Sequence, residues 1–408
     1  MRPMILTELS REAGHPSLMI LSDDDDLLAR AGQIALRCGV KVTGGAIAPP
    51  HPVVQESSGG APVEAHPPPG PGSAYPLHIS GSLLFGPRAG FERIFEVMAV
   101  SGDPDEALLA RSIETTLAPP PDHEIHCGDR VLKPASIDRG GRPLIMGILN
   151  VTPDSFSDGG RFADPAAAIA RGEEMAAQGA DIIDVGGEST RPGSQSVPAE
   201  EEIRRVLPVI ETLASRAGAP ISIDTTKAEV ARRAVAAGAT IINDISGMTI
   251  DPEMPATAAD LEVPVVLNHI RGVPRTMQDA PCYQHVVLEV LLDLAVRVQA
   301  TRDAGVDPAR IVIDPGIGFG KRPSDNFALL RHLPVFRSLG CPILVGVSRK
   351  SFLGSATGRP VTERSHATVA GEFFAALAGA EIIRTHDPAA ATDALKMALS
   401  LRGSAVTR

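Results

Sequence analysis

The feature that most constrains the fold is a regular alternation that begins near residue 123. Short apolar runs rich in Val, Ile and Leu alternate there with Ala-rich stretches of helical spacing, which is typical of repeated βα units around a parallel sheet. We expect strands at residues 144–149, 181–185, 220–224, 240–244, 263–267, 310–314, 342–346 and 381–385. Eight such units predict an α/β fold, a TIM (β/α)8 barrel, with an open doubly wound sheet as the alternative.

Helical stretches separate most of the predicted strands. The expected helices are residues 165–178, 199–217, 227–237, 283–304, 326–338 and 366–378. The fourth connection, 251–261, is short, and residues 387–401 close the series after the eighth strand. Before the first strand, residues 125–134 predict a short hairpin that plugs the N-terminal mouth of the barrel.

The first part of the chain does not share this alternation. We divide the chain into an N-terminal extension, residues 1–122, and a barrel domain, residues 123–408. Residues 47–75 are dense in Pro, Gly and Ser, a composition that cannot bury enough apolar surface to order itself. Around this insert, we expect a small α/β module of strands and helices at residues 18–21, 24–38, 78–85 and 104–117. No function follows for this extension from its residues.

Charge and hydropathy limit the partners. The chain carries 38 basic and 49 acidic residues, with no basic cluster, so a nucleic-acid surface is not expected. Its apolar runs fall well short of the roughly 20 residues that a membrane-spanning helix needs. The first residues lack the apolar core and cleavage site of a secretory signal. We therefore expect a cytoplasmic protein that acts on small molecules.

Polar side chains end each of the eight predicted strands. In a TIM barrel the site lies at the C-terminal ends of the strands, so these residues are expected to converge. They mix carboxylates, carboxamides and cations, which suits a heterocycle with donor and acceptor edges joined to an anionic group. The strand-end residues are Asn150, Asp184, Asp224, Asn243 with Asp244, Asn268 with His269, Asp314, Ser348 to Lys350, and Arg384 with His386 and Asp387.

An anionic group is indicated by the last strand. Arg384 and His386 lie two residues apart, so alternation along a strand points both side chains to the same side. Glycine-rich turns at 184–193 and 314–321 let backbone approach a phosphate or diphosphate, although neither has the spacing of a dinucleotide site. The loop at 150–160 carries Phe156 among polar residues and predicts either a mobile lid or a simple turn with Phe156 packed beneath it.

Seven segments together are specific for one family. They occur in order and cover nearly all of residues 125–402. The segments are MGILNVTPDSFSDGG (146–160), DVGGESTRPGS (184–194), SIDTTK (222–227), INDISG (242–247), IDPGIGFGK (313–321), VSRKSFLG (347–354) and IIRTHD (382–387). This set closely resembles dihydropteroate synthase, and the resemblance implies condensation of 6-hydroxymethyl-7,8-dihydropterin diphosphate with 4-aminobenzoate to give dihydropteroate in folate biosynthesis.

The resemblance also implies roles for individual residues. Asp224, Asn243, Asp314 and Lys350 would meet the pterin, and Thr190, Arg384 and His386 the diphosphate. A magnesium ion would be held by Asn150. The 4-aminobenzoate pocket would consist of Phe156, Arg191, Pro192, Phe319, Lys350 and Ser351. Asp158 would support a cationic intermediate. The expected catalytic residues are Asp158, Asp224, Lys350, Arg384 and His386. The family is expected to form a homodimer through the later helices.

Two segments depart from the pattern of the family. Where members usually show Met-His-Met, this chain has Asn268-His269-Ile270-Arg271, which is expected to alter the packing behind the pterin. Before the seventh helix it has Ser365-His366 instead of a Gly-Thr or Gly-Ser pair.

Two other functions compete with the synthase. A corrinoid-dependent pterin methyltransferase would need neither VSRKS nor the NVTPDSF loop, and both are present. A non-catalytic pterin-binding protein would be indicated by loss of Asn150, Arg384 or His386, and all three are retained.

Overall fold

The computed structural model of the chain divides into two compact units, Met1–Pro120 and Pro121–Arg408. In the second unit the structure describes residues 122–152, 164–189, 194, 196–283 and 286–401. In the first unit it describes the backbone of four strands. The expected helices at 24–38 and 104–117, and residues 48–75 of the insert, lie outside the described residues.

The four strands of the first unit form an antiparallel sheet in the order β1-β2-β4-β3. They are β1 (Ile5–Ser10), β2 (Ser17–Ser22), β3 (Lys41–Ile47) and β4 (Ile79–Phe85). β2 and β4 contain the two strands expected from the sequence. β1 and β3 were not expected, because the first mixes polar residues into its run and the second contains Gly44 and Gly45, which weaken a strand pattern.

The second unit is a parallel barrel, as expected from the alternation. Its sheet has the order β12-β11-β10-β9-β8-β7-β14-β13, and an isolated parallel bridge between Ile313 and Ile343 joins the two edges. The strands are β7 (Leu144–Asn150), β8 (Ile182–Gly186), β9 (Ile221–Asp224), β10 (Ile241–Asp244), β11 (Val265–Asn268), β12 (Ile311–Asp314), β13 (Leu344–Val345) and β14 (Ile382–Thr385). Closure of the ring excludes the open doubly wound sheet.

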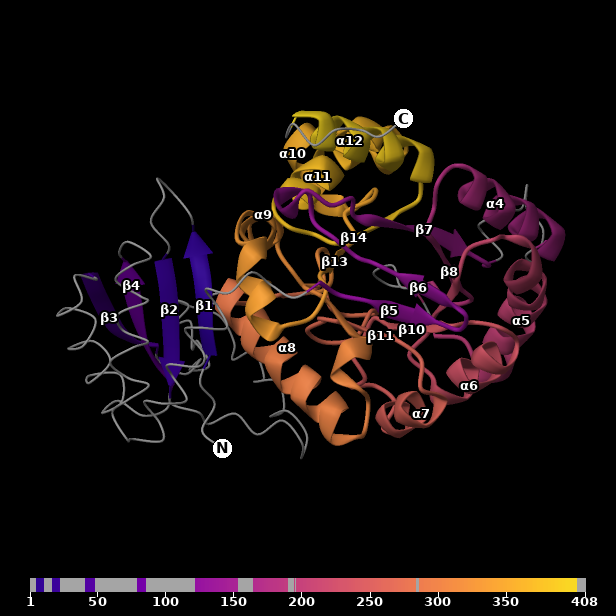
Figure 1. Ribbon diagram of the computed structural model, residues 1–408, viewed down its shortest axis with the longest axis horizontal. Coiled ribbons are helices and arrows are strands. Elements are labelled where there is room, and N and C mark those ends of the chain that lie inside the picture. Colours follow the sequence, from indigo (N-terminus) through magenta and orange to yellow (C-terminus); the bar gives the residue numbers. More distant parts are fainter. Residues whose placement is uncertain are drawn as a thin grey trace, which may run out of the picture. The chain divides into compact units, whose positions relative to one another are not determined.

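Helices surround these strands (Figure 1). They are α4 (Pro165–Ala177), α5 (Ala199–Arg216), α6 (Ala228–Ala236), α7 (Met254–Leu261), α8 (Val286–Asp303), α9 (Pro323–Arg331), α10 (Ser351–Thr357), α11 (Ser365–Leu377) and α12 (Pro388–Leu401). α10 was not expected. The expected helix at 326–338 is wrong in its second half, because Pro334 lacks a backbone N–H and disfavours α-helix at the residue before it. The chain instead continues as a 3-10 helix, Leu333–Leu339.

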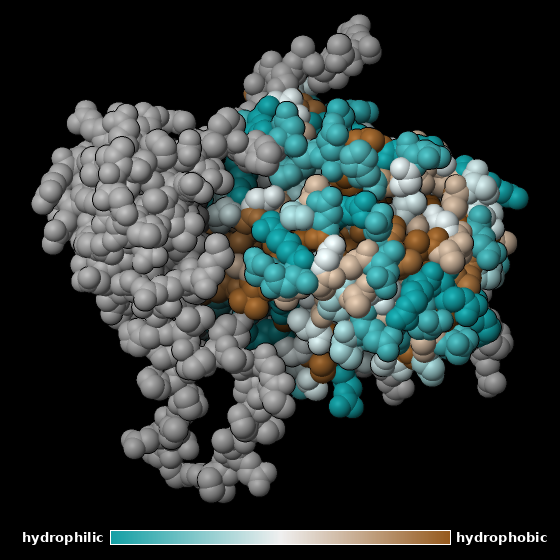
Figure 2. Space-filling view, turned by 60° about the horizontal axis from the view of Figure 1, so that its bottom comes forward, coloured by the Kyte–Doolittle hydropathy of each residue, from teal (hydrophilic) through white to brown (hydrophobic). Residues whose placement is uncertain are grey.

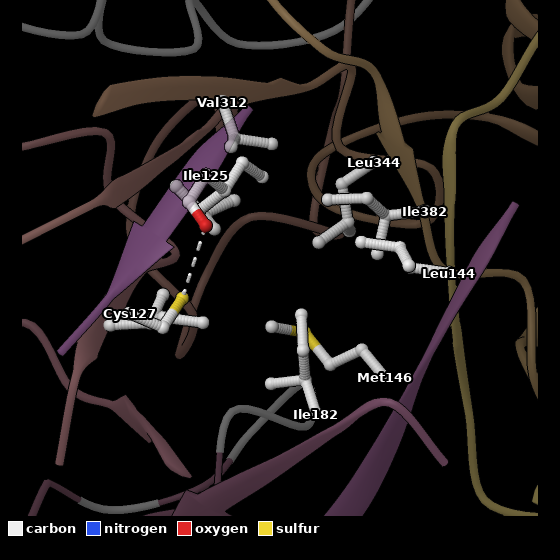
Figure 3. Packing of buried hydrophobic residues seen from close by; sticks show 10 residues of the cluster. Ile125, Cys127, Leu144, Met146, Ile182, Val312, Leu344 and Ile382 are labelled. Atoms are coloured by element: carbon white, nitrogen blue, oxygen red, sulfur yellow. Dashed lines mark hydrogen bonds between the residues drawn. The ribbon is translucent and has the colours of Figure 1, made fainter. Parts of the chain in front are cut away.

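A hairpin covers the N-terminal end of the barrel, which confirms the expected plug. It consists of β5 (Ile125–Cys127) and β6 (Arg130–Leu132) and crosses the middle of Figure 1. Ile125 and Cys127 pack in one buried cluster with residues from the barrel strands, among them Met146, Ile182 and Leu344 (Figure 3). The interior of the barrel is therefore closed at this end, and a ligand can enter only from the other.

We expect Ile125→Ala to lower the free energy of unfolding by about 2–5 kcal/mol, because Ile125 is 2% exposed and its removal leaves a cavity under the hairpin. Its activity should stay within about twofold of the unaltered protein, since the cluster lies at the closed end. Urea denaturation and steady-state kinetics measure the two effects. An unchanged unfolding free energy would contradict the assignment of the hairpin as part of the core.

The face of the barrel unit seen in Figure 2 is largely hydrophilic, with small hydrophobic patches between the polar residues. Within the described residues, no helix combines the length and hydropathy that crossing a membrane requires.

Candidate active site

Parallel pairing brings the polar strand ends to one level at the open end of the barrel. Asp224 lies opposite Gly186 on one neighbouring strand and opposite Asn243 on the other. Asn268 and Asp314 are paired in the same way. Because all eight strands run in one direction, residues that end strands far apart in sequence meet around one opening. The structure therefore gathers the expected site residues of β8 to β12 and β14.

The centre of this opening is an arginine between two aspartates. Arg384 donates from Nε to Asp184 Oδ2 at 2.7 Å and from Nη2 to Asp224 Oδ2 at 2.6 Å. Asn243 Nδ2 donates to Asp184 Oδ2 at 3.0 Å. The side chains are almost wholly buried, with 13% exposure for Arg384, none for Asp184 and 6% for Asp224. The family resemblance implies that Arg384 binds a diphosphate, and in the structure Arg384 is paired with two carboxylates.

Both aspartates keep one oxygen unused. Asp184 Oδ1 and Asp224 Oδ1 are buried and have no hydrogen-bond partner among the described residues. Leaving a buried acceptor unpaired is unfavourable, so these oxygens suit a ligand that brings N–H donors. Burial raises the pKa of Asp224 to about 7, with Arg384 opposing the shift and Asp184 adding to it.

A second part of the site lies on the loop after β12. Asp314 Oδ1 accepts from the backbone N–H of Gly316 at 2.8 Å. Burial raises the pKa of Asp314, and Lys350 opposes this most strongly. Lys350 donates to the carbonyl of Ile317, and its Nζ lies 4.5 Å from the centre of the Phe319 ring. Burial lowers the pKa of Lys350 to about 8, against the attraction of Asp314.

An apolar surface accompanies these charges. Phe319 forms a buried cluster with Ile245, Ile270 and Met277. Ile270 belongs to the segment that departs from the family pattern, and it supplies an aliphatic side chain to this cluster. A flat heterocycle could lie on such a surface while its edge meets the carboxylates, which is the usual division of roles in small-molecule sites.

A cleft of about 460 Å³ reaches Asp224 from outside. Its wall includes Glu188, Thr225, Lys227 and Ile245. Lys227 Nζ lies 2.5 Å from Glu188 Oε2 and 2.5 Å from Glu202 Oε2. Glu188 also accepts from the backbone N–H of Val197 at 3.1 Å, so it ties together the two ends of the loop after β8.

His386 follows β14 and is held by Ser348, which lies in the loop after β13. Its Nδ1 lies 2.9 Å from Ser348 Oγ, and its backbone N–H donates to the same oxygen at 3.2 Å. The carbonyl of His386 accepts from Arg171 Nη2 at 3.2 Å. The structure thus holds the ring and the backbone of His386 from two sides.

Several expected residues lie at the edge of the site or outside the described part. Asn150 is half-buried at the end of β7, and Ser351 is exposed at the start of α10. Phe156, Asp158, Thr190, Arg191 and Pro192 lie outside the described residues, so the lid and half of the predicted 4-aminobenzoate pocket stay predictions.

Two carboxyl groups that the structure buries have no role assigned from the sequence. Asp184 was recognised as a strand end but given no role, although its contact with Arg384 and Asn243 makes it central. Glu372 of α11 is 1% exposed, and burial raises its pKa to about 8. Its place in an Ala-rich helical stretch predicted only an ordinary helix, and no spacing rule indicates that this position faces the core.

Comparisons with known proteins identify the family. A family model described as pterin binding enzyme matches residues 146–386. The dihydropteroate synthase of a Synechocystis strain is 48% identical over 265 residues, which are 65% of this chain and 92% of the relative. That of Bacillus subtilis is 46% identical over 255 residues, 62% of this chain and 87% of the relative.

Solved structures extend the likeness to the fold. Dihydropteroate synthase from Xanthomonas albilineans with 4-aminobenzoic acid superposes with a TM-score of 0.64 at 47% identity, covering 69% of this chain and 99% of that one. The same enzyme in complex with 7,8-dihydropteroate has a TM-score of 0.61 at 45% identity, over 68% of this chain and 98% of that one. This chain belongs to the dihydropteroate synthase family of pterin-binding enzymes.

Proposed function

We propose that the barrel condenses 6-hydroxymethyl-7,8-dihydropterin diphosphate with 4-aminobenzoate and releases 7,8-dihydropteroate and diphosphate. The observation that carries this is the buried group of Asp184, Asp224, Asn243 and Asp314 with Lys350 and Arg384 at the open end of the barrel. Such a group matches a heterocycle with N–H donors and acceptors that is bonded to an anion.

The pterin would be recognised through hydrogen bonds to the polar edge of its ring. Asp314 would accept its amino and ring N–H groups, since a carboxylate pairs well with two parallel donors. The unpaired Oδ1 of Asp224 and the carboxamide of Asn243 support a second set of contacts. Phe319 and Ile270 would face the ring, and Lys350 would meet it from the side of Phe319.

Chemistry at this site needs positioning and charge. The C–O bond to diphosphate breaks with its electron pair on the departing oxygen, and the dihydropterin ring spreads the positive charge left on carbon. The lone pair of the amine then forms the C–N bond, and the amine gives up a proton. Arg384 and His386 would stabilise the departing anion, so no covalent nucleophile from the chain is required.

Magnesium fits this site as a partner of the diphosphate. Among the described residues, no three His, Cys, Asp or Glu side chains gather as a metal site. Magnesium does not require one, because it commonly takes one or two protein oxygens and keeps waters and phosphate oxygens as its other ligands. Asn150 would provide a carboxamide oxygen of that kind, and bound magnesium would supply charge that offsets the diphosphate.

The second substrate would enter above the pterin. Phe319, Lys350 and Ser351 come from two neighbouring loops, and Arg191, Pro192 and Phe156 are proposed to complete the pocket. Asp158 is proposed to support the cationic intermediate and Thr190 to bind the diphosphate. Closure of these loops would exclude water, which competes with the amine for the carbon.

The direct test follows diphosphate release from the full chain with dihydropterin diphosphate, with and without 4-aminobenzoate. We expect release and dihydropteroate formation that depend on both substrates and are lost when EDTA removes magnesium. The chain beginning at residue 123 is assayed beside it, so that any part played by the extension is seen. Pterin binding without product would instead favour a non-catalytic binding protein, and methyl transfer from a methylated folate to a corrinoid the methyltransferase.

We expect Ser351→Ala to raise the KM for 4-aminobenzoate about tenfold, because a hydrogen bond to a charged carboxylate is worth roughly 1.5–3 kcal/mol. The KM for the pterin substrate should change little. Initial rates with each substrate varied at saturating concentrations of the other measure the split. Equal shifts in both constants would remove Ser351 from the 4-aminobenzoate pocket.

We propose a cytoplasmic homodimer, which the family resemblance implies. Exposed apolar side chains on the last two helices support it, since Phe374 is 48%, Met397 57% and Leu401 71% exposed. Clustered exposed apolar residues are a usual feature of interfaces between subunits. Sedimentation equilibrium of the full chain measures its mass in solution, and a monomer at micromolar concentration would contradict the dimer.

A further inference from the structure

Lys321 ends the glycine-rich loop after β12, and its amino group is buried with only 3% of the residue exposed. Its Nζ lies 2.9 Å from His269 Nδ1, 3.3 Å from the carbonyl oxygen of His269 and 3.0 Å from that of Phe319. Burial lowers the pKa of Lys321 well below the ordinary value of a lysine, and three acceptors surround the N–H donors of its amino group. A buried lysine is costly to maintain, so a set of contacts that satisfies it completely calls for an explanation.

His269 links Lys321 to helix α8 through a second hydrogen bond. It follows β11, is fully buried, and its Nε2 lies 3.0 Å from Asp293 Oδ2 on α8. Burial lowers the pKa of His269 to about 3, so its ring is neutral at neutral pH. The carboxylate of Asp293 then favours the hydrogen on Nε2, which leaves the lone pair of Nδ1 for Lys321. Asp293, His269 and Lys321 thus form one hydrogen-bonded chain from α8 to the loop.

The loop itself depends on outside support. Gly316, Gly318 and Gly320 all have positive φ, a backbone conformation that leaves the segment easily deformed unless something holds it. A Cβ at Gly316 would lie 1.8 Å from the carbonyl oxygen of His269, so the loop is pressed directly onto the end of β11. Lys321 joins these same two segments by hydrogen bonds.

The groups that this loop presents are the proposed pterin ligands. Asp314 begins the loop and is tied to it by the N–H of Gly316. The carbonyl of Ile317 accepts from Lys350, and the carbonyl of Phe319 accepts from Lys321. A shift of the loop would therefore move the carboxylate of Asp314, the ring of Phe319 and the cation of Lys350 together.

We infer that Lys321, braced by His269 and Asp293, is a positioning residue that holds the loop at 315–320 in the geometry required to bind the pterin. This inference rests on the proposed function. Lys321 has no contact with the open cleft by Asp224, and it acts through Asp314, Phe319 and Lys350. The segment that departs from Met-His-Met thus keeps its histidine for support of the loop, while its neighbours pack around it.

The test is Lys321→Met, which keeps most of the length of the unbranched side chain and removes its donors. We expect the Kd for an unreactive pterin, measured by calorimetry, to rise about ten- to a hundredfold, the range for lost support of a binding group. The KM for 4-aminobenzoate should rise as well, because Phe319 and Lys350 belong to both proposed pockets. Ile125→Ala is the matched control, because it lowers stability at the closed end of the barrel and should leave both constants unchanged.

Two substitutions of His269 keep the inference testable if Lys321→Met does not fold. His269→Asn places an acceptor near the position of Nδ1 and should retain most of the pterin affinity. His269→Gln places its amide near Nε2, keeps the contact with Asp293, and should weaken pterin binding about as much as Lys321→Met. Unaltered pterin affinity in Lys321→Met, or in His269→Gln if Lys321→Met does not fold, would overturn the inference. Absence of dihydropteroate formation by the unaltered chain would instead overturn the proposed function.

Discussion

Arg384→Ala is expected to lower kcat/KM by about a thousandfold, with losses in both substrate binding and turnover. The arginine would stabilise the departing diphosphate, and removing one such donor typically costs on the order of 10²–10³ in kcat. It also offsets Asp184 and Asp224, whose Oδ2 atoms accept its hydrogen bonds at 2.7 and 2.6 Å. Without it, two buried carboxylates would face each other, and pterin binding would suffer as well. Steady-state kinetics with the pterin substrate varied measures the change.

The same substitution should lower stability by about 3–5 kcal/mol, the usual result of removing one partner from a buried ion pair. Arg384→Lys distinguishes the effect of the positive charge from that of the guanidinium geometry. Lysine supplies the charge but cannot donate from two separate nitrogens to Asp184 and Asp224. We expect it to recover most of the stability and little of the activity. Near-normal kcat/KM in Arg384→Ala, measured beside Ile125→Ala as the stability control, would remove Arg384 from the proposed catalytic group.

Asp314→Asn is expected to weaken pterin binding on the order of a hundredfold, because hydrogen bonds to a buried charged acceptor contribute about 1.5–3 kcal/mol. Asparagine retains one oxygen and places an N–H₂ group where the second oxygen stood. That group would face either the N–H of Gly316 or the N–H donors of the pterin, and either arrangement sets donor against donor. Calorimetry with an unreactive pterin measures the affinity directly.

Asp244→Asn provides the matched control for this substitution. Asp244 is as deeply buried as Asp314, and it accepts from the backbone N–H groups of Ser246 and Met248 at 2.7 and 3.0 Å in the turn after β10. Its loss should lower the free energy of unfolding and change pterin affinity by less than about threefold. If the two variants bind pterin equally well, Asp314 does not read the pterin edge.

The pairing of Arg384 with Asp224 also bears on substrate binding. Both residues are expected to bind the pterin diphosphate, yet in this structure they are hydrogen-bonded to each other. Oδ1 of Asp184 and Oδ1 of Asp224 have no hydrogen-bond partner among the described residues. A pterin can therefore donate to these oxygens while Arg384 stays bonded to the Oδ2 atoms. The arrangement satisfies the charges before substrate arrives and leaves acceptors for it.

The sequence by itself determined the barrel and the position of its site. Each barrel strand is buried on both faces, because helices cover its outer face and its inner face points into the barrel interior. Each strand therefore appears in the sequence as an unbroken apolar run, and a polar residue follows where the strand ends. That pattern was enough to predict all eight barrel strands, the plug at residues 125–134 and the strand ends that line the opening. Local chemistry also accounts for the end of α9, because Pro334 disfavours a continued α-helix and the chain changes there to a 3-10 helix.

Only the tertiary structure decided which of these residues meet. Arg384 and Asp184 are 200 positions apart, and Lys321 and His269 are 52 apart. Their contacts follow from the parallel register and from closure of the ring between Ile313 and Ile343. Residue spacing reports which face of a strand a side chain occupies, but not how far around the barrel its partner lies. Burial has the same origin, since Glu372 is enclosed only when α11 packs on the barrel.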